Sequence, residues 1–226
     1  MKILATLFPG FTAIDLIGPT NTWMFIPGVQ IQIAAAKPGP VATDIGLTIN
    51  ATHDFDTCFQ APDVLLVPGG ARGVFDALQD DGLVDTIARL GAKAGWVTSV
   101  CNGSLLLGAA GLLKGYKAGC YWYSREYLRQ FGAQPVNERI VIDRNRATGG
   151  GMTAGIDFAL AMMGHWGGDF SGQLAQLCME YAPRPPYSAG LPELAPPEVL
   201  AAAREILAKE MPNAVADATA RRRGFV

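Results

Sequence analysis

The stretch Trp96–Ser104, WVTSVCNGS, joins an apolar, β-branched run to an abrupt series of small residues. Leu105–Ala110, LLLGAA, follows directly and has the composition of a helix. This order predicts a strand, a sharp turn at Cys101 and a helix, which is a nucleophile elbow with cysteine in place of serine. Gly103 and Ser104 leave room for backbone to pass behind the turn. Free N–H groups and the helix dipole at such a helix start favour the thiolate form of the cysteine.

Cys101 also has a second interpretation, because a free cysteine at the end of a buried strand is commonly a core residue. The other cysteines, Cys58, Cys120 and Cys178, lie far apart and form no CxxC pair. With only two histidines in the chain, no spacing typical of a metal site can be built, so no metal is expected. The dispersed cysteines and the lack of a signal-peptide pattern predict a reduced, cytoplasmic protein.

Strands and helices alternate along the rest of the chain. Lys2–Leu7, Val29–Ala36 and Asp63–Val67 are short apolar runs of the kind that form buried strands. Segments between them have helical character, such as Asp81–Leu90, in which apolar residues recur on one face. Continuous apolar strands separated by helices predict an α/β fold with a doubly wound, mostly parallel central sheet.

The bulk composition limits the possible partners and the number of domains. A chain of 226 residues, half of them hydrophobic, predicts one domain with a large core over residues 1–226. The net charge of −2 gives no electrostatic reason to expect binding to nucleic acid or to an anionic membrane. No apolar run is long enough to span a bilayer.

Two regions in the second half of the chain have less regular patterns. Tyr121–Phe131 is predicted to be a helix. A proline-rich arm begins at about residue 183, and Pro197 then starts an amphipathic helix that extends to about Met211. We expect the arm to lie against the protein surface or a partner, and the Ala/Arg-rich tail after the helix to be frayed.

Three chemically useful segments follow predicted strands. In a parallel sheet, ligands bind beyond the carboxyl ends of the strands, so Asp15, Gly69-Gly70 and Cys101 are expected at one edge. Each segment has a structural alternative as well. Asp15 stands near a helix start and could be only an N-cap, whereas Gly69-Gly70 could be only a tight turn.

Several motifs together resemble the isocyanide hydratases of the PfpI-like branch of the class I glutamine amidotransferase-like superfamily. These motifs, in order along the chain, are AIDLIGP, VPGG, TSVCNGSLLLGAAGLL, TGGGMTAGIDFAL and EYAPRPPYSAG. The resemblance implies a flavodoxin-like three-layer sandwich, a homodimer and a cytoplasmic location. It also implies a hydro-lyase that converts an isocyanide to an N-substituted formamide without a metal or organic cofactor.

The resemblance places the catalytic cysteine at Cys101 and the essential carboxylate at Asp15. Cys101 would add to the isocyanide carbon to give a thioimidate, and Asp15 would supply the proton and then activate water. An anion beside a thiolate raises the pKa of the thiol, so the two groups should titrate as a coupled pair. The N–H groups of Gly70 and Asn102 could stabilise charge on the adduct, and Tyr121 could form part of the pocket wall.

Two departures from the pattern keep other functions open. Many relatives have a histidine about twenty residues after the cysteine, where this chain has Tyr121, and the hydratases have threonine where it has Asn102. The first change removes a Cys–His pair, and the second bears on substrate preference. A glyoxalase- or deglycase-like enzyme and a non-enzymatic ligand-sensing domain are the alternatives. Asp15 and Tyr121 disfavour the first, and the lack of a DNA-binding module disfavours the second.

Overall fold

The computed structural model describes all of residues 1–226. The strands are β1 (Lys2–Thr6), β2 (Gln30–Ala35), β3 (Gly39–Ala42), β4 (Thr48–Ala51), β5 (His53–Asp54), β6 (Val64–Val67), β7 (Trp96–Ser99), β8 (Lys117–Ala118), β9 (Gln134–Pro135), β10 (Ile140–Asp143) and β11 (Arg146–Gly149). The α-helices are α1 (Ala13–Trp23), α2 (Arg72–Ala77), α3 (Asp81–Gly91), α4 (Gly103–Ala109), α5 (Ala154–Gly167), α6 (Asp169–Cys178), α7 (Pro197–Glu210) and α8 (Ala214–Arg222). A 3-10 helix, η1, covers Arg125–Phe131.

A seven-stranded sheet in the order β10-β11-β7-β6-β1-β2-β5 forms the centre of the molecule. All neighbouring strands are parallel except β10 and β11, which form an antiparallel hairpin at one edge. The sheet order reverses at β1, because the chain passes from β1 outward to β2 and then returns to place β6 on the other side. Ligand sites in open α/β sheets lie beyond the carboxyl ends of strands at such a reversal.

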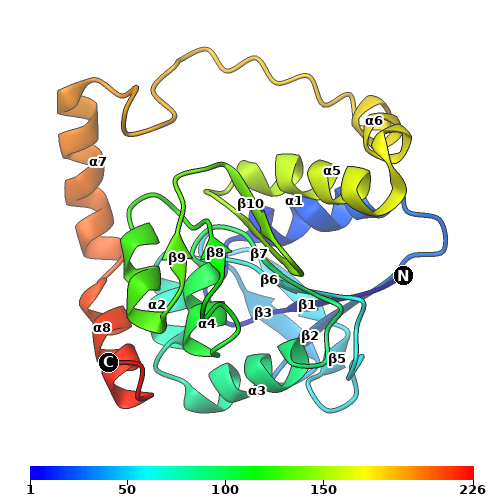
Figure 1. Cartoon of the computed structure of the whole chain (residues 1–226), viewed down its shortest axis with the longest axis horizontal. Helices are drawn as coiled ribbons and strands as arrows, with labels where there is room; N and C mark the ends of the chain where they lie inside the picture. Colours follow the sequence, from blue (N-terminus) through cyan, green and yellow to red (C-terminus); the bar gives the residue numbers. More distant parts are fainter.

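Helices cover both faces of this sheet (Figure 1). Helices α1, α5 and α6 lie on one face, where α5 contacts both of the others, and α2, α3 and α4 lie on the opposite face. The continuous apolar strands fit this arrangement, because β1, β6 and β7 have almost no exposed side chains. The predicted α/β sandwich with a mostly parallel sheet and a cysteine elbow is confirmed.

The segment between the elbow and the β10–β11 hairpin differs from the expected helix over Tyr121–Phe131. Residues 121–124 form turns, and only Arg125–Phe131 is helical, with 3-10 geometry. Gly132 ends this helix at φ +74°, a left-handed conformation that suits glycine. The apolar residues Leu128 and Phe131 are buried, so tertiary packing fixes a shorter helix than composition suggested.

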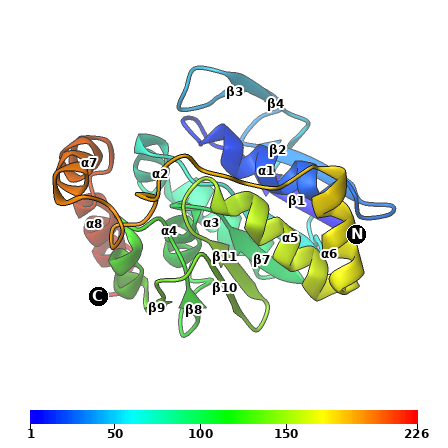
Figure 2. The same ribbon diagram turned by 90° about the horizontal axis from the view of Figure 1, so that it is seen from above.

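The C-terminal part of the chain extends away from the central sandwich before returning to it. The arm, defined here as residues 183–196, runs from α6 across the α1–α5 side to α7 (Figure 2), and none of its side chains is buried. Helix α7 also has no buried residue, whereas α8 packs Ala216, Thr219 and Ala220 against the body. The expectation of a frayed tail is therefore wrong.

Ion pairs and an aromatic contact hold the tail. Arg222 and Arg223 pair with Asp81 of α3, and Arg223 also pairs with Asp85 at 2.6 Å. The ring of Phe225 packs edge-on against Phe131 of η1, with 5.5 Å between ring centroids. A composition rich in alanine and arginine is thus ordered by charged partners on a distant helix. Elsewhere, no helix is at once long enough and apolar enough to cross a bilayer.

Candidate active site

Cys101 occupies the sharp turn between β7 and α4 in a left-handed backbone conformation, with φ of 57°. Such a conformation is strained for a residue other than glycine and needs surrounding contacts to maintain it. The Cys101 N–H donates to the carbonyl of Gly150 at 2.7 Å, and its own carbonyl accepts from the Tyr121 N–H at 3.4 Å. These contacts from two neighbouring segments hold the elbow that the sequence predicted.

Two glycines allow other backbone to approach the elbow closely. A Cβ atom on Gly103 would lie 2.3 Å from the carbonyl oxygen of Val67, which no side chain can tolerate. A Cβ atom on Gly69 would lie 2.6 Å from the Cys101 Cβ and 2.7 Å from the Asp15 Oδ2. Glycine at position 103 therefore lets α4 begin close to the end of β6. Glycine at position 69 lets the residues after β6 lie against both candidate catalytic residues.

Asp15 lies in the first turn of α1 and is fully buried. It is not the N-cap, because Thr12 occupies that position and α1 begins at Ala13. Its Oδ2 accepts a hydrogen bond from the Gly69 N–H at 3.0 Å, whereas Oδ1 has no hydrogen-bond partner. The Cys101 side chain lies close to this carboxyl group, because a Cβ atom on Gly69 would contact both, and the two charges interact. A buried carboxyl with one free oxygen beside a thiol is well placed to exchange a proton with it.

Burial dominates the ionisation of this pair. Burial raises the pKa of Asp15 to about 7, the Gly69 N–H opposes the rise, and the nearby charge of Asp44 adds to it. Burial, followed by the charge of Asp15, raises the pKa of the Cys101 thiol well above its ordinary value. The expectation that the helix start favours thiolate is therefore wrong for the resting state, because the single N–H of Asn102 does not offset burial.

The remaining predicted donors surround the nucleophile in different ways. The Asn102 N–H points to the Cys101 sulfur and stabilises its charged form. The Gly70 N–H forms no hydrogen bond within the protein, so it is available to a bound molecule. The Asn102 side chain is buried and faces away from any opening, because its amide donates to the Gly70 carbonyl at 3.3 Å and to the Met211 sulfur at 3.4 Å.

Cys120 is the second thiol near the nucleophile. It is buried, and its sulfur donates to the Asn102 Oδ1 at 3.7 Å. Burial raises the pKa of Cys120 to about 12, so this thiol stays protonated at neutral pH. The Cys120 thiol is therefore a neutral neighbour of Cys101 that fixes the orientation of the Asn102 amide.

A cleft of about 520 Å³ opens beside the elbow and is called the arm cleft here. Tyr121 and Gly150 line it, and both hydrogen bond to the backbone of Cys101. Burial, followed by the charge of Cys101, raises the pKa of the Tyr121 phenol, and the ring also contacts Gly151. Cys101 itself is only 3% exposed, so Tyr121 and Gly150 are the cleft residues that lie against the elbow.

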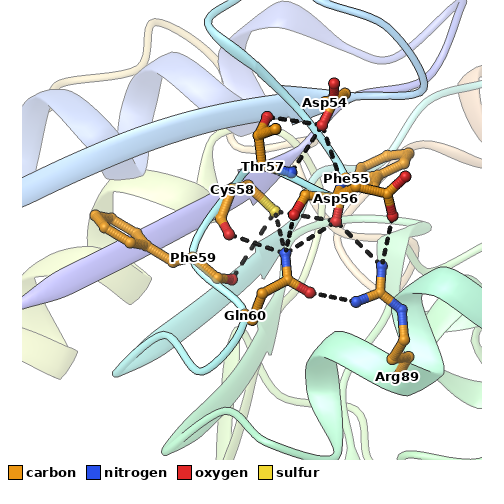
Figure 3. Close-up of polar contacts among 8 residues, drawn as sticks. All are labelled: Asp54, Phe55, Asp56, Thr57, Cys58, Phe59, Gln60 and Arg89. Carbon is orange, nitrogen blue, oxygen red and sulfur yellow. Dashed lines mark hydrogen bonds and ion pairs between the residues drawn. The ribbon is translucent and has the colours of Figure 1, made fainter.

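A different polar cluster surrounds the loop after β5 (Figure 3). The Asp54 carboxylate accepts from the Thr57 N–H at 2.7 Å, and the Gln60 side chain donates to carbonyls of the same loop, including that of Cys58 at 2.9 Å. Arg89 of α3 donates to the Phe55 carbonyl at 3.1 Å and so ties the loop to the helix layer. None of these groups hydrogen bonds to the elbow, so the cluster stabilises a loop and Cys58 is a buried structural residue.

The histidines and acidic residues form no second reactive centre. His53 contacts Gln32 at 3.1 Å and Thr52 at 2.8 Å, and His165 packs edge-on against Trp96. No group of three or more His, Cys, Asp and Glu side chains is arranged to hold a metal ion. Cys101 and Asp15 remain the candidate nucleophile and acid that lie together at the sheet edge.

Sequence reasoning missed one contributor to the site. Met211 follows α7 and reaches the Asn102 side chain across 109 positions of sequence. No local pattern could have revealed this contact, because a methionine after an amphipathic helix has no signature of its own. Gly69 was noted only as part of a turn, and its N–H contact to Asp15 could be seen only once β1 and β6 were placed side by side.

Comparisons with known proteins agree with this architecture. The family model described as the DJ-1/PfpI family matches residues 1–165. An isonitrile hydratase from Pseudomonas putida is 43% identical over 205 residues, which cover 91% of this chain and 89% of that protein. A deglycase from Thermococcus kodakarensis is 27% identical over 146 residues, which cover 64% of this chain and 87% of that protein.

A solved structure of a ThiJ/PfpI family protein from Pseudomonas syringae is 44% identical and superposes with a TM-score of 0.93. The superposition covers 97% of this chain and 90% of that protein, so it includes the arm and the C-terminal helices as well as the sheet. The match of the family model over most of the chain, the sequence identity and the superposition lead to one conclusion: this chain belongs to the DJ-1/PfpI family.

Proposed function

We propose that this protein is an isocyanide hydratase, which adds water to an isocyanide to give an N-substituted formamide. One observation carries the proposal: a buried carboxyl group with a pKa of about 7 and a free oxygen lies beside the thiol of the nucleophile elbow. The activity of the P. putida relative is of the same kind. Hydration of an isocyanide carbon needs a nucleophile and a proton at the same atom, and this pair offers both.

The first half of the reaction adds the Cys101 S–H group across the isocyanide carbon. The thiol proton passes to the Asp15 carboxylate as sulfur bonds to the carbon, and Asp15 then delivers that proton to the same carbon. The product is a thioimidate, in which the carbon carries sulfur, hydrogen and the nitrogen substituent. In this mechanism, the N–H groups of Gly70 and Asn102 stabilise charge that develops around the adduct.

The second half consumes one water molecule. The Asp15 carboxylate takes a proton from water while the water oxygen attacks the thioimidate carbon. The carbon–sulfur bond then breaks. The two hydrogens of water finish on the formamide nitrogen and on the Cys101 sulfur, so the enzyme returns to its starting state. The buried, largely apolar surroundings of the pair strengthen each charge interaction during these steps.

The direct test is formamide production from a simple aryl isocyanide, followed by absorbance and by product mass. We expect the formamide to gain one water oxygen, which labelled water would reveal. A protein that leaves the isocyanide unchanged while its Cys101 remains reduced would contradict the proposal.

The pH dependence of Cys101 reactivity follows from the shared proton of the pair. Below a pH of about 7, Asp15 and Cys101 both hold protons, so no thiolate forms, and loss of the first proton near the Asp15 pKa should switch the site on. Because burial raises the pKa of Cys101, the second proton is retained as the pH rises further. We therefore expect kcat/KM to rise through a pH of about 7 and then remain level.

Iodoacetamide labelling of Cys101 over the same pH range provides an assay that is independent of hydration. A labelling rate that still climbs tenfold per pH unit above about pH 8 would mean that Cys101 ionises alone, without Asp15.

The two alternative functions can be compared with the structure, because this chain lacks the histidine of a Cys–His pair. Tyr121 follows Cys120 at the place where a Cys–His pair would need its base, and both histidines of this chain are engaged elsewhere. Glyoxalase- or deglycase-like chemistry would therefore have to proceed with Asp15 as its base. Neither this route nor a ligand-sensing role explains why Asp15 is kept buried and unpaired on one oxygen.

We further propose that the protein is a homodimer. Phe170 and Leu177 of α6 are each 79% exposed, and Ile14 and Ile17 on the neighbouring α1 are also exposed. Large apolar side chains exposed on two helices that contact each other are typical of an interface. Sedimentation at micromolar concentration should give twice the 23.9 kDa chain mass, and Leu177→Glu should shift it to the monomer. A wild-type monomer under these conditions would reject the dimer.

We also propose that the enzyme is a single domain and that it is cytoplasmic. The 226 residues act as one domain, because Met211, Ala216 and Ala220 of the C-terminal part join the core formed by the sheet and its helices. A reduced, cytoplasmic environment suits a chain whose four cysteines are all unpaired, including the exposed Cys178.

A further inference from the structure

The arm cleft lies beside the elbow and is bordered by the arm. Gly150 and Tyr121 line part of it, and both hydrogen bond to the Cys101 backbone. Gly190–Glu193 of the arm line another part. The cleft therefore joins the surroundings of the elbow to the arm.

A second, smaller cavity shows how the arm sits on the aromatic pair Tyr121–Trp122. This cavity of about 100 Å³ is bordered by both aromatic residues, by Leu191 of the arm and by Leu200 of α7. The two rings are 5.9 Å apart between centroids. Tyr121, Trp122 and Leu191 thus border both cavities and form an apolar wall of the arm cleft beside the elbow.

One hydrogen bond anchors this wall. The Asn137 amide donates to the Glu193 Oε1 at 2.8 Å, and the Asn137 oxygen in turn accepts from Arg125. No other side chain of residues 183–196 hydrogen bonds to the body of the protein. Because the arm has no buried side chain, the Asn137–Glu193 contact is the feature that fixes where Leu191 lies.

We propose that Leu191, held in place by the Asn137–Glu193 hydrogen bond, forms with Tyr121 and Trp122 the binding wall for the nitrogen substituent of the substrate. This inference rests on the proposed function. A flat apolar substituent such as a phenyl ring can contact aromatic and leucine side chains together, whereas a methyl group cannot. Leu191 and Glu193 are therefore specificity-determining residues, although they lie about ninety positions after Cys101.

The first test compares kcat/KM for phenyl isocyanide and methyl isocyanide. We expect Leu191→Ala to reduce the phenyl-to-methyl ratio by roughly three- to tenfold, because the aromatic contact is lost. Glu193→Ala should reduce the ratio in the same direction, whereas Glu193→Gln should retain it, since a glutamine oxygen still accepts from Asn137. Glu205→Ala, on the exposed surface of α7, is the matched control and should leave the ratio unchanged.

The second test measures how fast thiol reagents reach Cys101, so it does not depend on hydration activity. The rates at which N-phenylmaleimide and N-methylmaleimide label Cys101 are compared by peptide mass, with free N-acetylcysteine in the same reaction as the reference thiol. Wild-type protein should favour the phenyl reagent at Cys101, and Leu191→Ala and Glu193→Ala should lose this preference. If labelling depends on the arm but no formamide forms, the proposed function fails and the binding wall stands. If neither ratio changes in these two variants, the inference is overturned.

Discussion

Replacing Cys101 by alanine or serine is expected to reduce formamide production by roughly 10⁴-fold or more. Alanine removes the atom that bonds to the isocyanide carbon. Serine keeps a nucleophilic atom, but its hydroxyl ionises far less readily than a thiol, and the burial that raises the pKa of Cys101 would act on the hydroxyl as well. The measurement is formamide formed per minute at saturating isocyanide, at a pH of about 8.

The fold should survive both replacements. Alanine and serine meet the same backbone strain at φ 57° as cysteine does, and the hydrogen bonds from the Cys101 backbone to Gly150 and Tyr121 do not involve the side chain. Cys178→Ser, at an exposed position on α6, is the matched control and should keep full activity. Turnover near the wild-type level in Cys101→Ala would show that catalysis is not covalent at this residue.

Replacing Asp15 by asparagine is expected to lower activity and raise stability at the same time. The amide cannot carry a proton through a catalytic cycle, so formamide production should fall by roughly 10²- to 10⁴-fold. The amide oxygen can still accept the Gly69 N–H, so the contact between β6 and α1 is preserved. A residue with a purely structural role would not show this opposite response of activity and stability.

The stability gain depends on pH in a direction set by the raised pKa of Asp15. The carboxyl ionises near 3.8 in the unfolded chain and near 7 in the folded protein, so the stability linked to its proton is fully present below pH 3.8 and is lost as the pH approaches 7. By about pH 8 the buried carboxylate costs about 4 kcal/mol, and asparagine avoids this cost. We expect the Tm of Asp15→Asn to exceed that of wild type by roughly 8–16 °C at this pH.

Melting curves at several pH values provide the check. The difference in Tm between Asp15→Asn and wild type should shrink towards zero near pH 4, where the wild-type carboxyl is largely protonated in both the folded and the unfolded protein. Asp169→Asn, the same chemical change at an exposed position on α6, should alter neither activity nor Tm. An active Asp15→Asn enzyme would assign the proton to another group, and an unstable one would mean that the charge of Asp15 supports the fold.

The features that local sequence could predict are those fixed by local geometry. The elbow at Cys101 was predictable because a β-branched strand stops at small residues, and Gly103 proves to be the position that close backbone contact requires. The meeting of Asp15 with Cys101 was predictable because parallel strands end at one edge of a sheet. The sheet and its helix layers followed from continuous apolar strands alternating with amphipathic segments.

The features that local sequence could not predict depend on contacts between distant segments. The composition of the tail suggested fraying, yet Arg223 finds Asp81 and Asp85 on α3 and orders α8. The protonated state of Cys101 could not be read from the elbow motif, because it depends on how much of the molecule covers the thiol. The position of Leu191 beside Tyr121 likewise depends on the path of an arm with no regular structure.

The contact between Asn102 and Met211 has a consequence for synthesis of the protein on the ribosome. The strands and the elbow are complete once residues 1–150 have emerged, but the Asn102 amide lacks its sulfur partner until residue 211 leaves the exit tunnel. At typical translation rates of about 5–20 residues per second, the 61 residues from 150 to 211 delay this contact by about 3–12 s. During that interval the nascent chain carries a formed elbow whose Asn102 amide still lacks its sulfur partner.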